Sequence, residues 1–436
     1  MLAEAPPRVG RQLHPDQGGN VKDLTSRLAR RARGKEPSPI RELQRYMKLP
    51  GMISLGGGYP NPDTFVFDRI DVRFKDGTSA ALEGKDLATA SQYGPSDAHP
   101  GLRDELIAWH RAKDGVDLDA SQIVVLNGCQ EGLFVMAYLL ADSEDSIALD
   151  EPTYPGALSA FRSFTQNFVA VPLDEHGMKT DVLEHELGHL ASGGRKLPKF
   201  IYTVPSGHNP GGVALSPERR RHLLDVASKF DVLVLEDDPY QLVRLDGSAP
   251  PPTLQSMDRD GRVVRLDSFS KVFAPGLRIG YASGPADVIR QFVLFKQSSN
   301  LHTSTFIQAL LHRYMATGGH DGFRAHIRRN CELYRRNRDA MVEAAREFLP
   351  ADVRFNVPNE GLFVWFVLPD ACDARRMVEE QCEKLKVILV PGGAFSTLGG
   401  LRNCMRASFS MVSPEDIREG MRRFGEMVRA ELARGQ

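Results

Sequence analysis

Several side chains that suit chemistry on a carbonyl compound follow short apolar segments of this 436-residue chain. The segment 263–267 is followed by Ser268-Phe269-Ser270-Lys271, and Arg278 lies seven residues further on. A lysine amine can attack a carbonyl carbon and form an imine, provided that burial and nearby charge lower its pKa. Serine hydroxyls and an arginine guanidinium are suited to a phosphate. The segment therefore predicts a nucleophilic lysine beside an anion site; an ordinary surface lysine is the alternative.

A carboxylate and a phenol follow the apolar segment 232–236, as Asp237 and Tyr240. A pyridine ring accepts electrons from a reacting carbon only while its nitrogen is protonated, and a buried carboxylate beside the nitrogen keeps it protonated. A phenol three residues further on can hydrogen-bond a hydroxyl of the same ring. The alternative is a pair of aspartates, Asp237 and Asp238, that merely caps a loop.

Three more turns follow apolar segments. Gly128-Cys129-Gln130 opens a helical pattern, and such a turn exposes N–H groups that bind phosphate. Tyr154 can stack on an aromatic ligand. Asn209 lies in a loop rich in glycine and proline, 205–212. Taken singly, these are an ordinary turn, a core tyrosine and a structural loop. Because ligands bind beyond the carboxyl ends of parallel strands, we expect the five groups to share one site.

The elements that must position these residues alternate between strand and helix from residue 123 to about 284, which predicts an α/β domain with a mostly parallel, seven-stranded sheet. From about residue 305 two long helices are followed by short strands and a helix, which predicts a smaller α+β domain. The expected strands of the large domain are 123–127, 146–150, 168–171, 199–204, 232–236, 263–267 and 278–283, with helices at 130–140, 155–164 and 216–230. The expected elements of the small domain are helices 305–317, 322–347 and 373–385 and strands 361–368, 387–390 and 404–409.

The length of the chain exceeds the roughly 250–300 residues that one core usually serves, so we expect more than one domain. Residues 1–35, rich in Pro, Gly and Arg, are expected to form a flexible arm, with order beginning near Pro37. The segment 36–90 would contribute to the small domain and to dimer contacts. The large domain would span 91–305 and the small C-terminal domain 306–436.

Composition narrows the class of protein. The formal net charge is -1, so neither a nucleic acid nor a membrane surface is the expected partner. Five scattered cysteines without a CxxC pair indicate free thiols in a reducing compartment, and we expect a cytoplasmic enzyme.

As a set, these motifs resemble the class I/II aminotransferases, which have fold type I and depend on pyridoxal 5'-phosphate (PLP). The resemblance runs from about Pro37 to near the C-terminus. It rests on Ser268-Phe269-Ser270-Lys271 with Arg278, on Asn209-Pro210-x-Gly212 and on Asp237-x-x-Tyr240. Finer motifs look like the α-aminoadipate/kynurenine/aromatic aminotransferase subgroup: Pro39-Ile40-Arg41, 53–58, 93–96, 150–154, 202–205 and 406–410.

The resemblance implies a role for each residue at the cofactor. Lys271 would hold PLP as a Schiff base and move the proton at the substrate Cα, while Asp237 would pair with the pyridinium nitrogen. Tyr240 and Asn209 would bind the ring oxygen, and Tyr154 would stack on the ring. The phosphate would be held by Cys129, Gln130, Ser268, Ser270 and Arg278.

The resemblance also implies a homodimer with shared sites. Tyr93 would reach the phosphate of the other subunit. Arg406 would bind the substrate α-carboxylate, whereas Arg41 and the segment 56–60, with Gly58 and Tyr59, would cover its side chain. The expected reaction moves the amino group of 2-aminoadipate, an aromatic amino acid, kynurenine or a large aliphatic amino acid to a 2-oxo acid such as 2-oxoglutarate. Four residues depart from the usual pattern and leave the choice of substrate open: Tyr59, Cys129, His208 and Gly211.

Three other functions are considered. His185-Glu186-Leu187-Gly188-His189 matches the H-E-x-x-H pattern of zinc peptidases, but no convincing third ligand follows it, so no metal site is expected. A transcription regulator with an aminotransferase-like domain would need a DNA-binding module of a size that the first 35 residues do not provide. A PLP enzyme of the same fold could instead be a racemase, lyase, decarboxylase or cyclase, because PLP labilises any of the bonds at Cα.

Overall fold

The computed structural model describes residues 24–39, 46, 49–53, 55–56 and 58–434. The chain forms two compact units, each made of two separate stretches. One unit comprises Met1–Leu140 and Pro252–His326, and the other comprises Ala141–Pro251 and Ile327–Gln436. The domain boundaries expected from the sequence remain a prediction.

The α/β fold expected from the sequence is confirmed. All seven expected strands are present, together with β6, a two-residue strand too short to leave a periodic pattern. The first unit contains strands in the order β3-β10-β9 and the second contains β8-β7-β4-β5-β6, which makes eight strands where the sequence predicts seven. Strands β10 and β6 are antiparallel to their neighbours within their own unit, whereas β8, β7, β4 and β5 run parallel. The bounds are β3 Ile123–Leu126, β10 Gly280–Ser283, β9 Val263–Ser268, β8 Leu233–Asp237, β7 Phe200–Thr203, β4 Ser146–Glu151, β5 Asn167–Asp174 and β6 Gly177–Met178.

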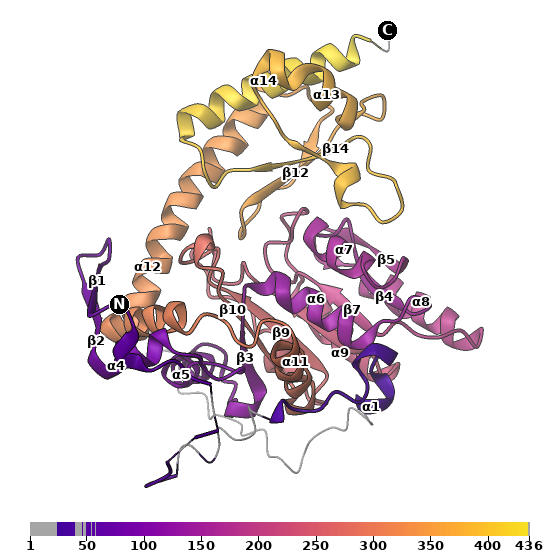
Figure 1. Ribbon diagram of the computed structural model, residues 1–436. Coiled ribbons are helices and arrows are strands. Elements are labelled where there is room, and N and C mark those ends of the chain that lie inside the picture. Colours follow the sequence, from indigo (N-terminus) through magenta and orange to yellow (C-terminus); the bar gives the residue numbers. More distant parts are fainter. Residues whose placement is uncertain (1–23, 40–45, 47–48, 54, 57, 435–436) are drawn as a thin grey trace, which may run out of the picture. The chain divides into compact units, whose positions relative to one another are not determined.

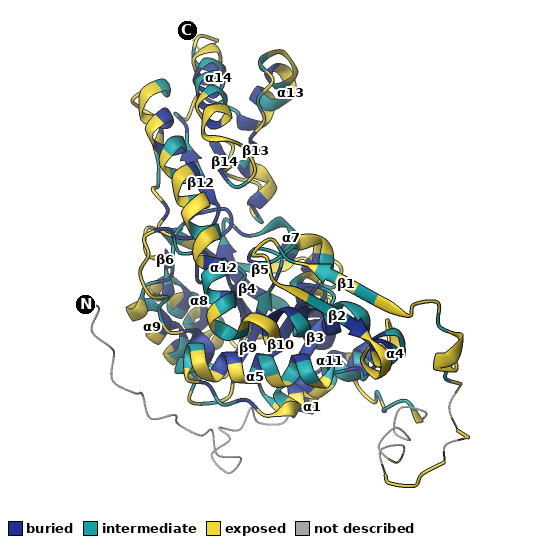
Figure 2. Ribbon diagram, turned by 90° about the vertical axis from the view of Figure 1, so that its left-hand side faces the viewer, coloured by how far each residue is buried: buried dark blue, intermediate teal, exposed yellow. Residues whose placement is uncertain are grey.

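The helices of the first unit begin and end at residues that cap them. In α5 (Pro100–Asp114), the His99 side chain accepts a hydrogen bond from the Leu102 N–H, and the helix ends at Gly115, which has a φ of 67°. Helix α6 (Cys129–Leu140) is apolar on most of its surface, because it packs against β3, β9, β10 and α11 (Ala286–Ser298). The hairpin β1 (Arg69–Arg73) and β2 (Ser79–Glu83) packs on α4 (Gly84–Ser91) and exposes much of β1 (Figure 2).

Residues 24–35 also belong to the first unit and lie against α6. The Ala29 N–H donates to the Leu139 carbonyl at 2.7 Å, and an Arg31 guanidinium nitrogen donates to the Tyr138 carbonyl at 3.2 Å. These contacts lie within the segment 1–35, for which the sequence predicts a flexible arm; that expectation remains a prediction. The short helices of this unit are α1 Leu24–Arg27, α10 Leu254–Met257, η2 Arg30–Ala32, η3 Pro62–Thr64, η4 Ala120–Gln122 and η5 Pro275–Leu277.

The second unit contains α7 (Pro155–Arg162), α8 (Thr180–Ser192) and α9 (Pro217–Lys229). The expected start of α9 is confirmed: the Ser216 hydroxyl accepts a hydrogen bond from the Arg219 N–H, and Pro217 occupies the first turn.

The C-terminal part of the second unit is a four-stranded antiparallel sheet with helices α13 and α14 packed beside it (Figure 1). The two long helices expected before it are present as α12 (Thr305–Phe348), interrupted at Gly319, where φ is 59° and ψ is -172°. The expected strand 387–390 is found later in the chain, at Val390–Pro391. The other bounds are β11 Arg354–Phe355, β12 Phe363–Val367, β14 Cys404–Ser408, α13 Ala374–Leu385, α14 Pro414–Leu432 and η6 Gly392–Phe395. Within the part of the chain that the structure describes, no helix combines the length and apolarity needed to cross a membrane.

Candidate active site

The turn between β3 and α6 brings Arg278 to the N-terminal end of a helix in the first unit. Gly128 has a φ of 82°, and a Cβ built on it would lie 2.6 Å from Nη2 of Arg278. The guanidinium therefore occupies the space that a side chain would fill, and its Nη2 donates to the Asn127 carbonyl at 3.4 Å. A cation and the N-terminal end of a 12-residue helix meet here, and both favour a phosphate.

The segment that carries Lys271 lies next to this turn. Gly280, at the start of β10, pairs with both Leu126 of β3 and Ser268 of β9. A Cβ on Gly280 would lie 2.8 Å from the Asp267 carbonyl oxygen and 3.2 Å from the Cys129 nitrogen, so only a glycine allows this approach. The Cys129 thiol also donates to the Asp267 carbonyl, at 3.2 Å.

The residues after β9 form a tight turn. The Ser270 N–H donates to the Ser268 hydroxyl at 3.1 Å, and Lys271 is half-buried. The following carbonyl, that of Val272, accepts a hydrogen bond from Nε2 of His326 at 2.7 Å. The structure thus brings Cys129, Ser268, Ser270, Lys271 and Arg278 to one edge of the sheet of this unit, with Gln130 exposed in the first turn of α6.

An ion pair between Lys296 and Glu131 stabilises the turn between β3 and α6. The Glu131 carboxylate accepts from the Asn127 N–H at 2.5 Å and from Nζ of Lys296 at 3.4 Å. Lys296 is fully buried, and its ammonium also donates to the Thr303 hydroxyl at 2.9 Å. Burial lowers the pKa of Lys296, and the charge of Glu131 opposes this. Sequence reasoning missed this pair; its only signal was a glutamate in the first turn of a helix that opens on glycine.

In the second unit, Asp237 and Tyr240 lie where the sequence placed them, at the end of β8. Asp237 is 4% exposed and accepts a hydrogen bond from the Tyr202 hydroxyl at 3.0 Å. Burial, and then the charge of Asp237, raise the pKa of Tyr240 above its ordinary value, and they raise the pKa of Tyr202 in the same way. Both phenols therefore stay protonated and are able to donate. The role of Tyr202 was not expected from the sequence.

Arg406 lies in the same cluster. Its Nη1 donates to the Asn209 amide oxygen at 2.8 Å. The guanidinium carbon lies 4.4 Å from the ring centroid of Phe363 and 5.1 Å from that of Phe395. Burial lowers the pKa of Arg406, while the neighbouring phenols Tyr240 and Tyr154 raise it. An arginine packed beside two aromatic rings and hydrogen-bonded at one nitrogen suits planar, two-point binding of a carboxylate.

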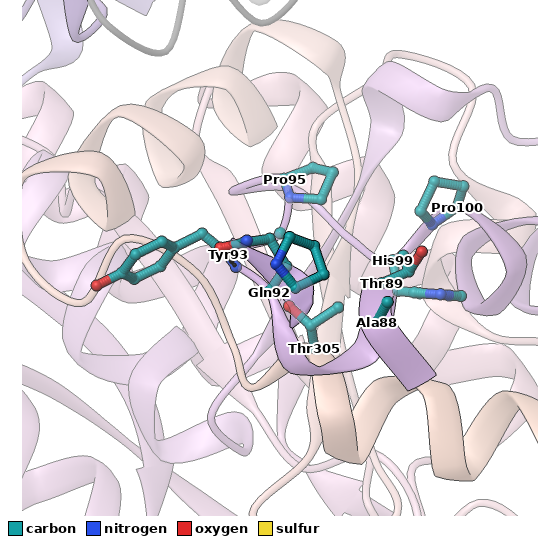
Figure 3. A pocket seen from close by; sticks show the side chains of 10 residues that line it. Ala88, Thr89, Gln92, Tyr93, Pro95, His99, Pro100 and Thr305 are labelled. Atoms are coloured by element: carbon teal, nitrogen blue, oxygen red, sulfur yellow. Dashed lines mark hydrogen bonds between the residues drawn. The ribbon is translucent and has the colours of Figure 1, made fainter. Parts of the chain in front are cut away.

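The remaining expected site residues lie nearer the N-terminus. Arg41 lies outside the described residues. Gly58 is exposed, and Tyr59 packs edge-on against Tyr93, with ring centroids 6.2 Å apart. Tyr93 is 53% exposed and lines a cavity of about 270 Å³. Its ring points away from Thr305 and the other labelled residues of that cavity (Figure 3).

The H-E-x-x-H motif lies on α8, where the His185 side chain is 80% exposed and Nδ1 lies 3.7 Å from the Glu186 carboxylate. The described residues contain no group of three His, Cys, Asp or Glu side chains placed to hold a metal ion. Nothing in the described part of the chain therefore adds a third ligand to the motif.

The fold and the comparisons with known proteins define a fold type I PLP-dependent transferase. Within that class, the chain belongs to the aminotransferases of class I and II, whose family model matches residues 66–424. The chain is 37% identical to aromatic-amino-acid aminotransferase 1 of Thermococcus litoralis over 410 residues, which cover 94% of this chain and 96% of the relative. It is 35% identical to the mitochondrial kynurenine/alpha-aminoadipate aminotransferase of Bos taurus over 421 residues, which cover 91% and 97%. The chain is also similar to the crystal structure of kynurenine aminotransferase from Pyrococcus horikoshii in complex with PMP, KYN and KYA. The two structures align with a TM-score of 0.76 at 35% identity, and the alignment covers 94% of this chain and 99% of that chain.

The chain is therefore an amino-acid aminotransferase that uses pyridoxal 5'-phosphate and acts on amino acids and 2-oxo acids. The described residues fit this cofactor. Gly128 leaves room for Arg278 at a helix N-terminus, which suits the phosphate, and the buried Asp237 carboxylate suits a protonated ring nitrogen.

Proposed function

We propose that this enzyme moves the amino group of an aromatic amino acid, kynurenine, 2-aminoadipate or a large aliphatic amino acid to a 2-oxo acid such as 2-oxoglutarate. The observation that carries this proposal is Arg406, because its guanidinium is fixed by Asn209 and by two aromatic rings. Such a group binds an α-carboxylate at two points. The names of the relatives support aromatic amino acids, kynurenine and 2-aminoadipate as donors.

Each remaining residue has a proposed task. Bound PLP supplies an aldehyde and an electron-accepting ring. Lys271 holds the cofactor covalently, and its Nζ moves the proton at the substrate Cα. Asp237 keeps the ring nitrogen protonated, Tyr240 and Asn209 bind the ring oxygen, and Tyr154 stacks on the ring. Cys129, Gln130, Ser268, Ser270 and Arg278 bind the phosphate, Cys129 through its backbone N–H.

The active enzyme is proposed to be a cytoplasmic homodimer with shared sites. Large apolar side chains of the N-terminal segment are exposed in the single chain, among them Ile53 at 84% and Leu55 at 95%. A second subunit would cover such surface. Tyr93 would bind the partner's phosphate, and Arg41, Gly58 and Tyr59 would cover the substrate side chain.

The test is the absorption spectrum of the purified holoenzyme while single amino acids are added. Conversion of the aldehyde form to the amine form by one of the proposed donors is the expected result, and it names the donor. A cofactor spectrum that never reaches the amine form would overturn transamination and favour racemase, lyase, decarboxylase or cyclase chemistry.

Lys271→Ala should abolish turnover, and Lys75→Ala, at an exposed lysine of the β1–β2 turn, is the matched control. Turnover that survives Lys271→Ala would refute the role of Lys271.

A further inference from the structure

Two adjacent carboxylates end strand β4, and each contacts a different loop beside Arg406. Asp150 is fully buried, and Glu151 is half-buried. Strand geometry sends successive side chains to opposite faces of a sheet, so neighbouring residues can serve different partners. All the residues that carry this argument belong to the second unit.

Asp150 contacts the loop that presents Asn209. Its carboxylate accepts from the Val204 N–H at 3.1 Å and from the Thr203 hydroxyl at 3.3 Å. It also lies 3.3 Å from Nε2 of His208. Nδ1 of His208 accepts from the Gly211 N–H at 3.1 Å, whereas the contact between Nε2 and Asp150 lacks the geometry of a hydrogen bond. His208 thus joins the end of β4 to the loop on either side of Asn209.

Glu151 contacts the loop that presents Phe395. Its carboxylate accepts from the Ser396 hydroxyl at 2.5 Å, from the Thr397 N–H at 3.0 Å and from the Thr397 hydroxyl at 2.9 Å. The Phe395 carbonyl in turn accepts from the Thr153 N–H at 2.9 Å. The Phe395 ring is fully buried, and its position is therefore fixed from the end of β4.

Arg406 lies between the two loops. Asn209 accepts a hydrogen bond from its Nη1, and the guanidinium carbon lies 5.1 Å from the ring centroid of Phe395. Both neighbours depend on contacts made by one dipeptide of β4. A guanidinium binds a carboxylate through two parallel hydrogen bonds, so a small rotation of its plane weakens both.

We infer that Asp150 and Glu151 are positioning residues that hold Arg406, through Asn209 and Phe395, in the plane in which it binds the substrate α-carboxylate. The inference rests on the role proposed for Arg406. Neither carboxylate touches the substrate. Their contribution is to restrict the guanidinium to one orientation before the substrate arrives.

The test uses Glu151→Gln. An amide keeps the shape of the side chain but places an NH₂ group against one of the donors of Ser396 or Thr397. The holoenzyme is titrated with 3-phenylpropanoate, which has a carboxylate and no amine, and with 2-phenylethylamine, which has an amine and no carboxylate; the spectrum of the bound cofactor reports both. We expect the Kd for the carboxylate to rise about tenfold, equivalent to about 1.4 kcal/mol, and the Kd for the amine to stay unchanged. Glu175→Gln, at an exposed glutamate between β5 and β6, is the matched control.

The same change in an Arg406→Ala background separates positioning from a general structural role. If Glu151 acts through Arg406, Glu151→Gln has no further effect on carboxylate binding there, because the two changes share one partner. Equal weakening of both probes, or undiminished weakening without Arg406, would overturn the inference. If Arg406→Ala leaves carboxylate binding unchanged, the proposed role of Arg406 fails instead. Thr397→Val removes one donor and serves as a second variant should Glu151→Gln not fold; carboxylate binding that stays at the wild-type level in this variant would equally refute the inference.

Discussion

The substitution Asp237→Asn tests the electron-accepting role of the cofactor ring at one atom. Asp237 is 4% exposed, and Oδ2 accepts a hydrogen bond from the Tyr202 hydroxyl. An asparagine has the same shape, and its amide oxygen can accept that same hydrogen bond. The variant should therefore fold, and the change that matters is the loss of one buried negative charge.

The size of the effect follows from that charge. An opposite charge within hydrogen-bond reach changes a pKa by about 1 to 3, which is about 10- to 1000-fold in the protonated fraction of the ring nitrogen. Taking the middle of this range, we expect the Cα proton to be removed about 100-fold more slowly, which corresponds to about 2.7 kcal/mol in the barrier. The pKa of Tyr240 should fall toward its ordinary value, because the charge of Asp237 helps to raise it.

The assay is the single-turnover half-reaction, followed by rapid mixing of the holoenzyme with a donor that the wild type accepts. Asp238→Asn is the matched control, because Asp238 is equally buried and accepts a hydrogen bond from the Ser206 hydroxyl. An Asp237→Asn rate within about threefold of wild type would refute the reasoning, since that leaves less than one decade, or 1.4 kcal/mol, for the charge. An equally slow Asp238→Asn enzyme would refute it too, by showing that any lost buried charge has the same effect.

Two further predictions concern residues outside the direct contacts to the ring. Burial lowers the pKa of His110 to about 4, whereas the pKa of a histidine in an unfolded chain is about 6.5. Between these pH values the unfolded state binds a proton that the folded state does not, so the protein loses stability as the pH falls from about 6.5 to about 4. This costs about 3 kcal/mol in full, and His110→Gln should remove that part of the pH dependence in unfolding curves measured from pH 7 to pH 4; an unchanged slope would refute it. Lys296→Met leaves the Glu131 carboxylate without its buried ammonium, which should destabilise the protein by about 3–5 kcal/mol and weaken PLP binding. Thermal unfolding measures the loss of stability, and PLP titration measures the weaker binding. The double variant Lys296→Met/Glu131→Gln should recover part of the loss. An unchanged melting temperature of Lys296→Met would contradict the role of the ion pair.

The fold could be predicted from the sequence where single elements carry their own signal. The buried strands are continuous apolar runs, and α9 has its cap and its first-turn proline in the sequence. Strand β6 could not be predicted, because two residues have no periodicity. Within each unit the positions of candidate residues directly after strands could be expected from the sequence, as for Ser268 after 263–267 and Asp237 after 232–236. What could not be predicted was the close approach at Gly280, which depends on a register between three strands.

The supporting residues were missed for a related reason. Asp150 and Glu151 were noted only as part of a motif. Glu151 accepts hydrogen bonds from Ser396 and Thr397, which lie 245 and 246 positions further along the chain. No local pattern records such a partner, and a carboxylate at the end of a strand is usually exposed. A buried carboxylate must accept hydrogen bonds, so the groups that donate to it are held in a fixed position relative to the end of the strand. The residues proposed to bind the cofactor and the substrate were therefore accessible from motifs. Asp150 and Glu151, proposed to position Arg406, became visible only in the contacts that they make with distant loops.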